Sequence, residues 1–330
     1  MKMKYDDFIE RIVEEIKPLL PEEVEKVSSM PVRKNNEVEL TGLVVQDKSN
    51  ISPVIYLTPY FYQYLDGRSF EAILADVAGQ YSKYRQTENF DVQKIMSWDS
   101  VKSNVIRKLV NYGMNKNMLE QMPYVREEDF AVVYQVIVSD MDKDQEYSSV
   151  TVKHEYMDTW GVTLEELNDA ALNNTRRILP ARLDNLADVF AQLEDISLPF
   201  LEEMNIHILT NNKKVYGAVH VLDPVVMEYI KEKVGEDVYY VIPSSVHEVL
   251  LIPYNEDYEC STLEEMIREV NQTQLQDVEV LSNKAYVMDT VEKKLLLASK
   301  YESYRKELEL KEKQEKMSKD WTEPEQNPKL

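Results

Sequence analysis

Short apolar segments occur in this sequence as neighbouring pairs, and this pairing constrains the fold more than any other feature. Each segment has the residues of a β-strand, and only a few turn-forming residues separate it from its neighbour. The pairs are residues 37–45 with 53–57, 206–210 with 215–221, 238–242 with 246–252, and two segments within 278–297. Antiparallel strands can be joined by a tight turn, whereas parallel strands need a long crossover connection. The sequence therefore predicts an α+β fold of antiparallel hairpins and sheets, with helices packed against them.

One segment lacks the alternation of a half-exposed strand. Phe130–Val138, FAVVYQVIV, is almost continuously apolar. A strand of this composition is buried on both faces, so we expect it in the centre of a sheet. A turn is expected at Asp140–Glu146, followed by a strand from Val150 to Tyr156 that alternates between two faces.

Helices are predicted where apolar residues recur at helical spacing, often behind a capping residue. Thr163 with Glu166 and Ser261 with Glu264 have the spacing of a capping box, and Asp223-Pro224 is a typical helix start. The predicted helices cover residues 8–16, 58–66, 70–81, 101–109, 163–172, 183–193, 224–235 and 261–270.

The length of 330 residues is typical of two domains. We place a boundary around Asp195–Pro199 and expect an N-terminal α+β domain at residues 1–195. Residues 196–298 are predicted to form a C-terminal α+β domain of hairpin and helix units. Residues 299–330 are rich in helix formers and poor in apolar residues, which predicts a charged tail that is helical or disordered.

The charge of the chain limits its partners. The sequence has 38 basic and 60 acidic residues, a net charge of -22. Such a charge repels nucleic-acid phosphates and anionic membranes, so direct nucleic-acid binding is disfavoured and no membrane partner is expected. No apolar run reaches the roughly 18 residues that span a bilayer, and the first residues have helical spacing instead of a signal-peptide pattern. The single cysteine, Cys260, fits a reducing compartment, so we predict a cytoplasmic protein.

Several kinds of catalytic motif are missing from the sequence. All seven glycines are isolated, which excludes the usual glycine-rich loops that bind phosphates. None of the four histidines has the spacing of a local metal-ligand pair. We therefore predict no cofactor and no metal site.

The most distinctive stretch is Val241–Pro253, which contains Ser244, Ser245 and His247. A serine and a histidine this close together invite the hypothesis of a serine-type hydrolase with an acid from elsewhere in the chain. However, a catalytic triad is a spatial arrangement, and neighbouring residues on a strand alternate faces. The alternative is that the serines form a tight turn and His247 packs beside it.

Tyrosines gather in the segment IYLTPYFYQYL, within a chain that has 21 of them. Tyr60, Tyr62 and Tyr64 fall on a short predicted helix, where they must point in different directions. Exposed tyrosines among acids would provide contact area for a basic partner. Packing of these rings into the core is the alternative.

Three stretches together resemble a known but uncharacterised family. They are Pro53–Leu57 with Tyr60–Tyr64, Trp160–Leu172 with Asn173-Asn174, and Tyr239–Pro253. The family is of the domain-of-unknown-function type and is found largely in anaerobic Gram-positive bacteria and their mobile elements. The first two stretches are also distantly similar to YtpQ-like uncharacterised proteins. This resemblance covers most of residues 1–298 and implies a cytoplasmic bacterial protein, but no reaction and no catalytic residue.

The leading hypothesis from the sequence is a non-enzymatic binding or regulatory protein. It would act on a partner protein through an acidic surface that carries tyrosines, with Tyr60, Tyr62 and Tyr64 as candidate binding residues. The alternatives are the hydrolase around Ser244, Ser245 and His247, and an acidic mimic of nucleic acid that occupies a basic groove.

Overall fold

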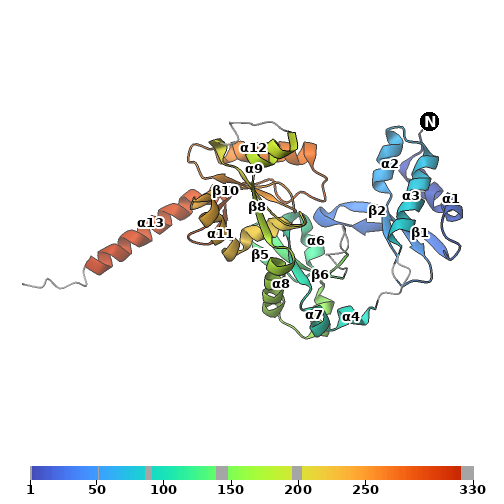
Figure 1. Cartoon of the computed structure of the whole chain (residues 1–330), viewed down its shortest axis with the longest axis horizontal. Helices are drawn as coiled ribbons and strands as arrows, with labels where there is room; N and C mark the ends of the chain where they lie inside the picture. The colour runs from blue at the N-terminus through green and yellow to red at the C-terminus, as the bar shows by residue number, and fades with distance from the viewer. Residues whose placement is uncertain (1, 51, 86–90, 139–147, 195–202, 321–330) are drawn as a thin grey trace, which may run out of the picture. The chain divides into compact units, whose positions relative to one another are not determined.

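A computed structural model describes residues 2–50, 52–85, 91–138, 148–194 and 203–320 (Figure 1). The chain divides into two compact units. Unit 1 is Met1–Lys102 with Glu155–Val162, and unit 2 is Ser103–His154 with Thr163–Leu330. The boundary predicted at Asp195–Pro199 lies outside the described residues, as does the turn predicted at Asp140–Glu146.

Unit 1 is built on a small antiparallel sheet with helices packed against it. The sheet has the order β1-β2-β3, with β1 at Lys26–Arg33, β2 at Glu39–Gln46 and β3 at Val54–Tyr56. The hairpin predicted over residues 37–57 is confirmed as β2 and β3, whereas β1 was not predicted. The helices are α1 (Tyr5–Glu15), α2 (Thr58–Leu65), α3 (Phe70–Tyr84), α4 (Gln93–Met96), α5 (Trp98–Val101) and α7 (His154–Trp160), with short 3-10 turns η1 (Lys17–Leu19) and η2 (Asn35–Glu37).

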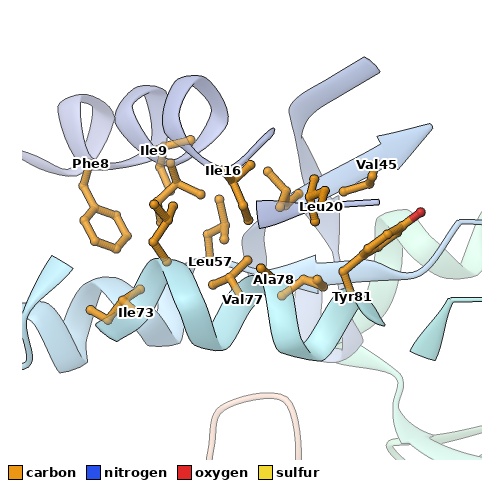
Figure 2. Close-up of a cluster of buried hydrophobic side chains, with 14 of the residues drawn as sticks. Phe8, Ile9, Ile16, Leu20, Val45, Leu57, Ile73, Val77, Ala78 and Tyr81 are labelled. Carbon is orange, nitrogen blue, oxygen red and sulfur yellow. The ribbon is translucent and has the colours of Figure 1, made fainter. Parts of the chain in front are cut away.

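The core of unit 1 lies between α1, α3 and the sheet. Phe8 of α1, Leu43 of β2 and Ile73 of α3 are fully buried in one cluster. Figure 2 shows the side chains of α1 directed towards those of α3, with Leu57 between them. The helical spacing of apolar residues in both segments therefore reflects this shared core, as predicted for residues 8–16 and 70–81.

Unit 2 contains two antiparallel sheets among its described residues. In the first, β6 (Phe130–Ile137) pairs with β4 (Val105–Asn111) on one edge and with β5 (Val125–Glu127) and β7 (Ser149–Thr151) on the other. Every residue of β6 is buried, which confirms the predicted central strand. The second sheet has the order β13 (Lys294–Leu297), β12 (Tyr286–Asp289), β10 (Val238–Pro243), β11 (Val249–Pro253), β9 (His207–Asn211) and β8 (Ala181–Asn185).

The remaining elements of unit 2 are mostly helices. They are η3 (Gly113–Asn115), α6 (Lys116–Leu119), α8 (Leu164–Ile178), α9 (Leu186–Glu194), η4 (Gly217–Leu222), α11 (Pro224–Val234), α12 (Cys260–Gln274) and α13 (Ala298–Asp320). The capping box of Thr163 with Glu166 is present at the start of α8, and Gly235 ends α11 in a left-handed conformation. The predicted α+β class is confirmed by this arrangement of helices and antiparallel sheets. Within the described residues, no helix is both long enough and apolar enough to cross a membrane.

Several local predictions were wrong. Residues 183–185 were expected in a helix and form the end of β8, before α9 begins at Leu186. Residues 105–109 were expected in a helix and belong to β4, whose burial on both faces hides the alternation of a strand. The strand expected through Tyr156 ends at Thr151, because His154 begins α7. Residues 217–221 were expected in a strand and form η4 after Tyr216, which has a φ of 53°. Finally, α12 begins at Cys260 without the side-chain cap expected from Ser261.

The helix α8 covers the free edge of β4. The Asn174 amide donates to the backbone oxygen of Val105 (3.0 Å), and the backbone N–H of Arg107 donates to the Thr175 hydroxyl (2.9 Å). These contacts satisfy backbone groups that an edge strand otherwise leaves unpaired. They also fix β4 against α8 at the position of Arg107.

Candidate functional site

The serines of the distinctive stretch lie in the tight turn between β10 and β11. The Ser245 backbone N–H donates to the backbone oxygen of Glu248 (3.0 Å), and the Ser245 hydroxyl accepts the backbone N–H of His247 (3.0 Å). The hydroxyl of Ser244 lies 3.5 Å from a Glu248 carboxylate oxygen. Both hydroxyls thus contact groups within the turn itself.

The contacts that the described residues make with the His247 imidazole involve groups other than the serine hydroxyls. Its Nδ1 accepts the backbone N–H of Tyr216 (3.1 Å), and its Nε2 lies 3.9 Å from a carboxylate oxygen of Glu279. The ring stacks on Tyr216 with centroids 5.3 Å apart. Because Nδ1 accepts a hydrogen bond, the proton of the neutral ring is on Nε2. A serine hydrolase needs an imidazole nitrogen that takes the serine proton, and the described contacts provide no such pair. The hydrolase hypothesis stays a prediction from the sequence.

Three histidines are expected to stay neutral at a pH where a free histidine is half protonated. Burial lowers the pKa of His207, His220 and His247 below the ordinary value. The folded state therefore disfavours the charged imidazoles, so their contribution to stability is present above the unfolded pKa of about 6.5 and is lost as the pH falls through the lower folded values. We expect less than half protonation of each imidazole at pH 6.5, measured by NMR titration of the ring signals. A ring that is mostly protonated there contradicts this assignment.

The predicted tyrosine surface on α2 divides into buried and exposed rings. Tyr60 and Tyr64 pack against the core of unit 1, and the Tyr64 hydroxyl accepts the backbone N–H of Met3 (3.2 Å). Burial raises the pKa of Tyr60. Tyr62, by contrast, is 62% exposed. Of the three candidate residues, Tyr62 presents the larger free surface, while Tyr60 and Tyr64 mainly connect α2 to the core.

A second tyrosine-bearing surface, in unit 2, was not found from the sequence. We name it the acidic hollow. It is an open hollow of about 800 Å³ at the end of β11, and its lining includes carboxylates, two tyrosines and no basic side chain. The residues that line it are Glu203, Met204, Asn205, Glu236, Ile252, Pro253, Tyr254, Asn255, Glu256, Asp257 and Tyr258. The sequence signal was the run Asn255–Glu259, where acids surround a tyrosine, but it says nothing of the distant Glu203 and Glu236.

The loop that carries most of these residues is held by a tyrosine beneath it. The Tyr240 hydroxyl lies 3.3 Å from the backbone oxygens of both Asn255 and Tyr258, and its single proton is shared between these two acceptors. The Tyr240 ring stacks on Tyr254 at 4.9 Å, and the Asn255 side chain accepts the backbone N–H of Asp257 (2.9 Å). The loop is therefore preorganised, with its acidic and aromatic side chains fixed to the second sheet.

The charges of the acidic hollow are largely uncompensated. Glu256 pairs with Arg305 of α13. In the described part of the chain, Glu203, Glu236 and Asp257 form no ion pair. Among the described residues, no group of three or more histidine, cysteine or acidic side chains is arranged to hold a metal ion. The acidic hollow therefore presents negative charge to solvent without the geometry of a cation cage.

Comparison with known proteins gives a family. Residues 5–290 match a family of unknown function, DUF5688. The chain belongs to this family. No curated protein and no solved structure matches it. The DUF5688 match spans residues of both units and ends before β13 and α13. Membership of DUF5688 assigns no reaction, so the function must come from the geometry.

Proposed function

We propose that this DUF5688 protein is a binding protein that recognises a basic segment of a partner protein at the acidic hollow. The observation that carries this proposal is the hollow of about 800 Å³ whose lining has four carboxylates, two tyrosines and no basic residue. It keeps the hypothesis of an acidic, tyrosine-bearing surface but moves its centre from Tyr62 to Tyr254 and Tyr258.

The chemistry of the lining favours lysine or arginine side chains. Glu203, Glu236 and Asp257 offer carboxylates without competing ion pairs among the described residues, so a cationic side chain gains attraction without displacing a partner. Tyr258 is 37% exposed and lies beside them. An aromatic face attracts a cation through its ring, and tyrosine is enriched at the energetic centres of interfaces. A nucleic acid is disfavoured as the partner because the net charge of -22 repels its phosphates.

The basic-partner proposal is tested with labelled peptides in fluorescence anisotropy. We expect an oligolysine peptide to bind and an oligoglutamate peptide of the same length not to bind. The combined variant Glu236→Gln and Asp257→Asn should weaken oligolysine binding about five-fold, because each exposed ion pair contributes roughly 0.2–1 kcal/mol. Binding should also weaken as salt rises from about 0.05 M to about 0.5 M, since salt screens exposed charges.

A matched control separates a local site from the overall charge of the protein. Glu265 and Glu269 are exposed on α12 and do not line the acidic hollow, so Glu265→Gln with Glu269→Gln removes the same number of charges elsewhere. This control should bind oligolysine as the wild type does. Equal weakening in both double variants would show that only net charge attracts the peptide, and equal binding of oligoglutamate would remove the proposal of a basic partner.

We also propose that the protein works in the reducing cytoplasm of a bacterium. The support is the single Cys260, whose thiol has a pKa raised by burial and by Glu264. A thiol with a raised pKa is poorly reactive towards disulfide exchange. The bacterial origin and the similarity to YtpQ-like proteins stay predictions from the sequence.

A further inference from the structure

Arg107 lies in β4, and among the described residues its buried guanidinium has no hydrogen-bond partner. The residue is 7% exposed, and its Nε is fully buried and unpaired. The backbone N–H of Arg107 donates a hydrogen bond to the Thr175 hydroxyl, but the side chain makes no such bond within the described residues. Burial lowers the pKa of this guanidinium, but an arginine stays protonated in proteins. Unit 2 therefore buries a permanent positive charge that no described carboxylate pairs with.

The carboxylate of Asp223 influences Arg107 but is engaged by another arginine. Its Oδ2 accepts from Arg176 Nε (2.7 Å), and its Oδ1 accepts from the terminal nitrogen of Arg176 (2.6 Å) and from the backbone N–H of Val225 (2.9 Å). Asp223 is 2% exposed. Both carboxylate oxygens of Asp223 thus already accept hydrogen bonds. Arg107 is attracted to Asp223 electrostatically but does not form a hydrogen bond with it.

The surroundings of Arg107 contain a second arginine, two carboxylates and a buried histidine. Three charged groups act on Arg107: the buried carboxylate of Asp223, the guanidinium of Arg176 and the carboxylate of the exposed Glu127. His220, also 2% exposed, donates from Nε2 to the backbone oxygen of Leu179 (2.8 Å), so the neutral ring keeps a lone pair on Nδ1. The helix α11 begins directly after Asp223 and adds the partial positive charge of its N-terminus.

We propose that Arg107 anchors a binding site for a small oxyanion, a phosphate or carboxylate group, beside β4 and the start of α11. A guanidinium presents a planar fork of donors that matches two oxygens of such a group. A buried charge is retained in a folded protein when it is paired, and this pairing would come from the ligand. The region borders solvent, because the Arg176 side chain is 33% exposed next to Asp223.

Oxyanion binding is tested by thermal unfolding of the full chain at constant ionic strength. We expect phosphate or acetate to raise the unfolding midpoint of the wild type relative to chloride, because a ligand of the folded state stabilises it by mass action. Arg107→Met should abolish this rise. Phosphate and acetate together distinguish a phosphate ligand from a carboxylate ligand. Arg182→Met, which removes a half-exposed arginine paired with Asp184, is the control that should keep the rise.

Two further measurements keep the oxyanion proposal open to contradiction if Arg107→Met fails to fold. Arg107→Lys keeps the charge but loses the fork, so the apparent affinity for the oxyanion should fall about ten-fold. NMR line widths of phosphate and acetate should broaden in the presence of the wild-type protein, which needs no variant. Equal oxyanion responses of the wild type and Arg107→Met, or unchanged line widths with the wild type, would overturn the proposal.

Discussion

Gly217→Ala is expected to destabilise unit 2 by about 3 kcal/mol, at the upper end of the usual cost of overpacking. A Cβ at this position would lie 2.7 Å from the backbone oxygen of His247, 2.7 Å from Thr210 Cα and 2.8 Å from the Asn211 backbone nitrogen. All three atoms belong to the backbone, so no side-chain rotation relieves the contacts. The start of η4 would have to move away from β9 and from the turn that precedes β11.

Two hydrogen bonds show why that movement is unfavourable. The Thr210 hydroxyl donates to the His247 backbone oxygen (2.9 Å), and the His247 ring accepts the backbone N–H of Tyr216 (3.1 Å). A shift of η4 that accommodates the new methyl group would stretch or break both contacts. Loss of a typical intramolecular hydrogen bond costs about 1 kcal/mol, which agrees with the expected size of the effect.

The Gly217 prediction is measured by urea unfolding followed by circular dichroism. Gly79→Ala is the matched control, since a Cβ there meets nothing within 4 Å and the residue is exposed within α3. That control should be neutral or stabilise the protein by up to about 1 kcal/mol, because alanine favours a helix more than glycine does. A Gly217→Ala variant as stable as the wild type would show that the close approach of η4 is not required.

The hairpins were predictable from the sequence because they depend on local signals. The pairs β2 with β3 and β10 with β11 join strands that are close in the chain, and turn residues mark the connections. The segment β4 was misread because its Val105 and Leu109, together with Val101 of α5 before it, have the spacing of a helix. Burial on both faces removes the alternation that would distinguish a strand, so periodicity alone cannot decide such a segment.

The acidic hollow could not be predicted because it is assembled from residues far apart in the chain. Glu203, Glu236 and Asp257 come together only when the second sheet of unit 2 has formed. Arg107 is a similar case, since a lone arginine in an apolar strand gives no sign of whether a carboxylate will meet it. Tyr62, in contrast, is exposed, which agrees with the prediction that the tyrosines of this short helix point in different directions.

Asp223→Ala is expected to destabilise unit 2 by about 4 kcal/mol, since breaking a buried ion pair by removing one partner costs roughly 3–5 kcal/mol. The variant loses the two hydrogen bonds with Arg176 and the cap of α11 at Val225. It also removes the carboxylate whose negative charge acts on both Arg107 and Arg176. The free energy of unfolding in urea measures the effect. Asp237→Ala, at the opposite end of α11 in an exposed pair with Lys231, should change it by less than about 1 kcal/mol.

The contribution of Asp223 should depend on pH in one direction. Burial alone would raise its pKa, but hydrogen bonds from Arg176 and Val225 and the charge of Arg176 hold the pKa below the ordinary value. A carboxylate with a lowered folded pKa stabilises the protein above its unfolded pKa of about 3.9 and loses this contribution as the pH falls through the folded value. The difference in unfolding free energy between wild type and Asp223→Ala should therefore be constant from about pH 7 to about pH 5 and shrink below about pH 4. A difference that grows in acid would mean that Asp223 is protonated in the folded protein and that Arg176 does not stabilise its charge.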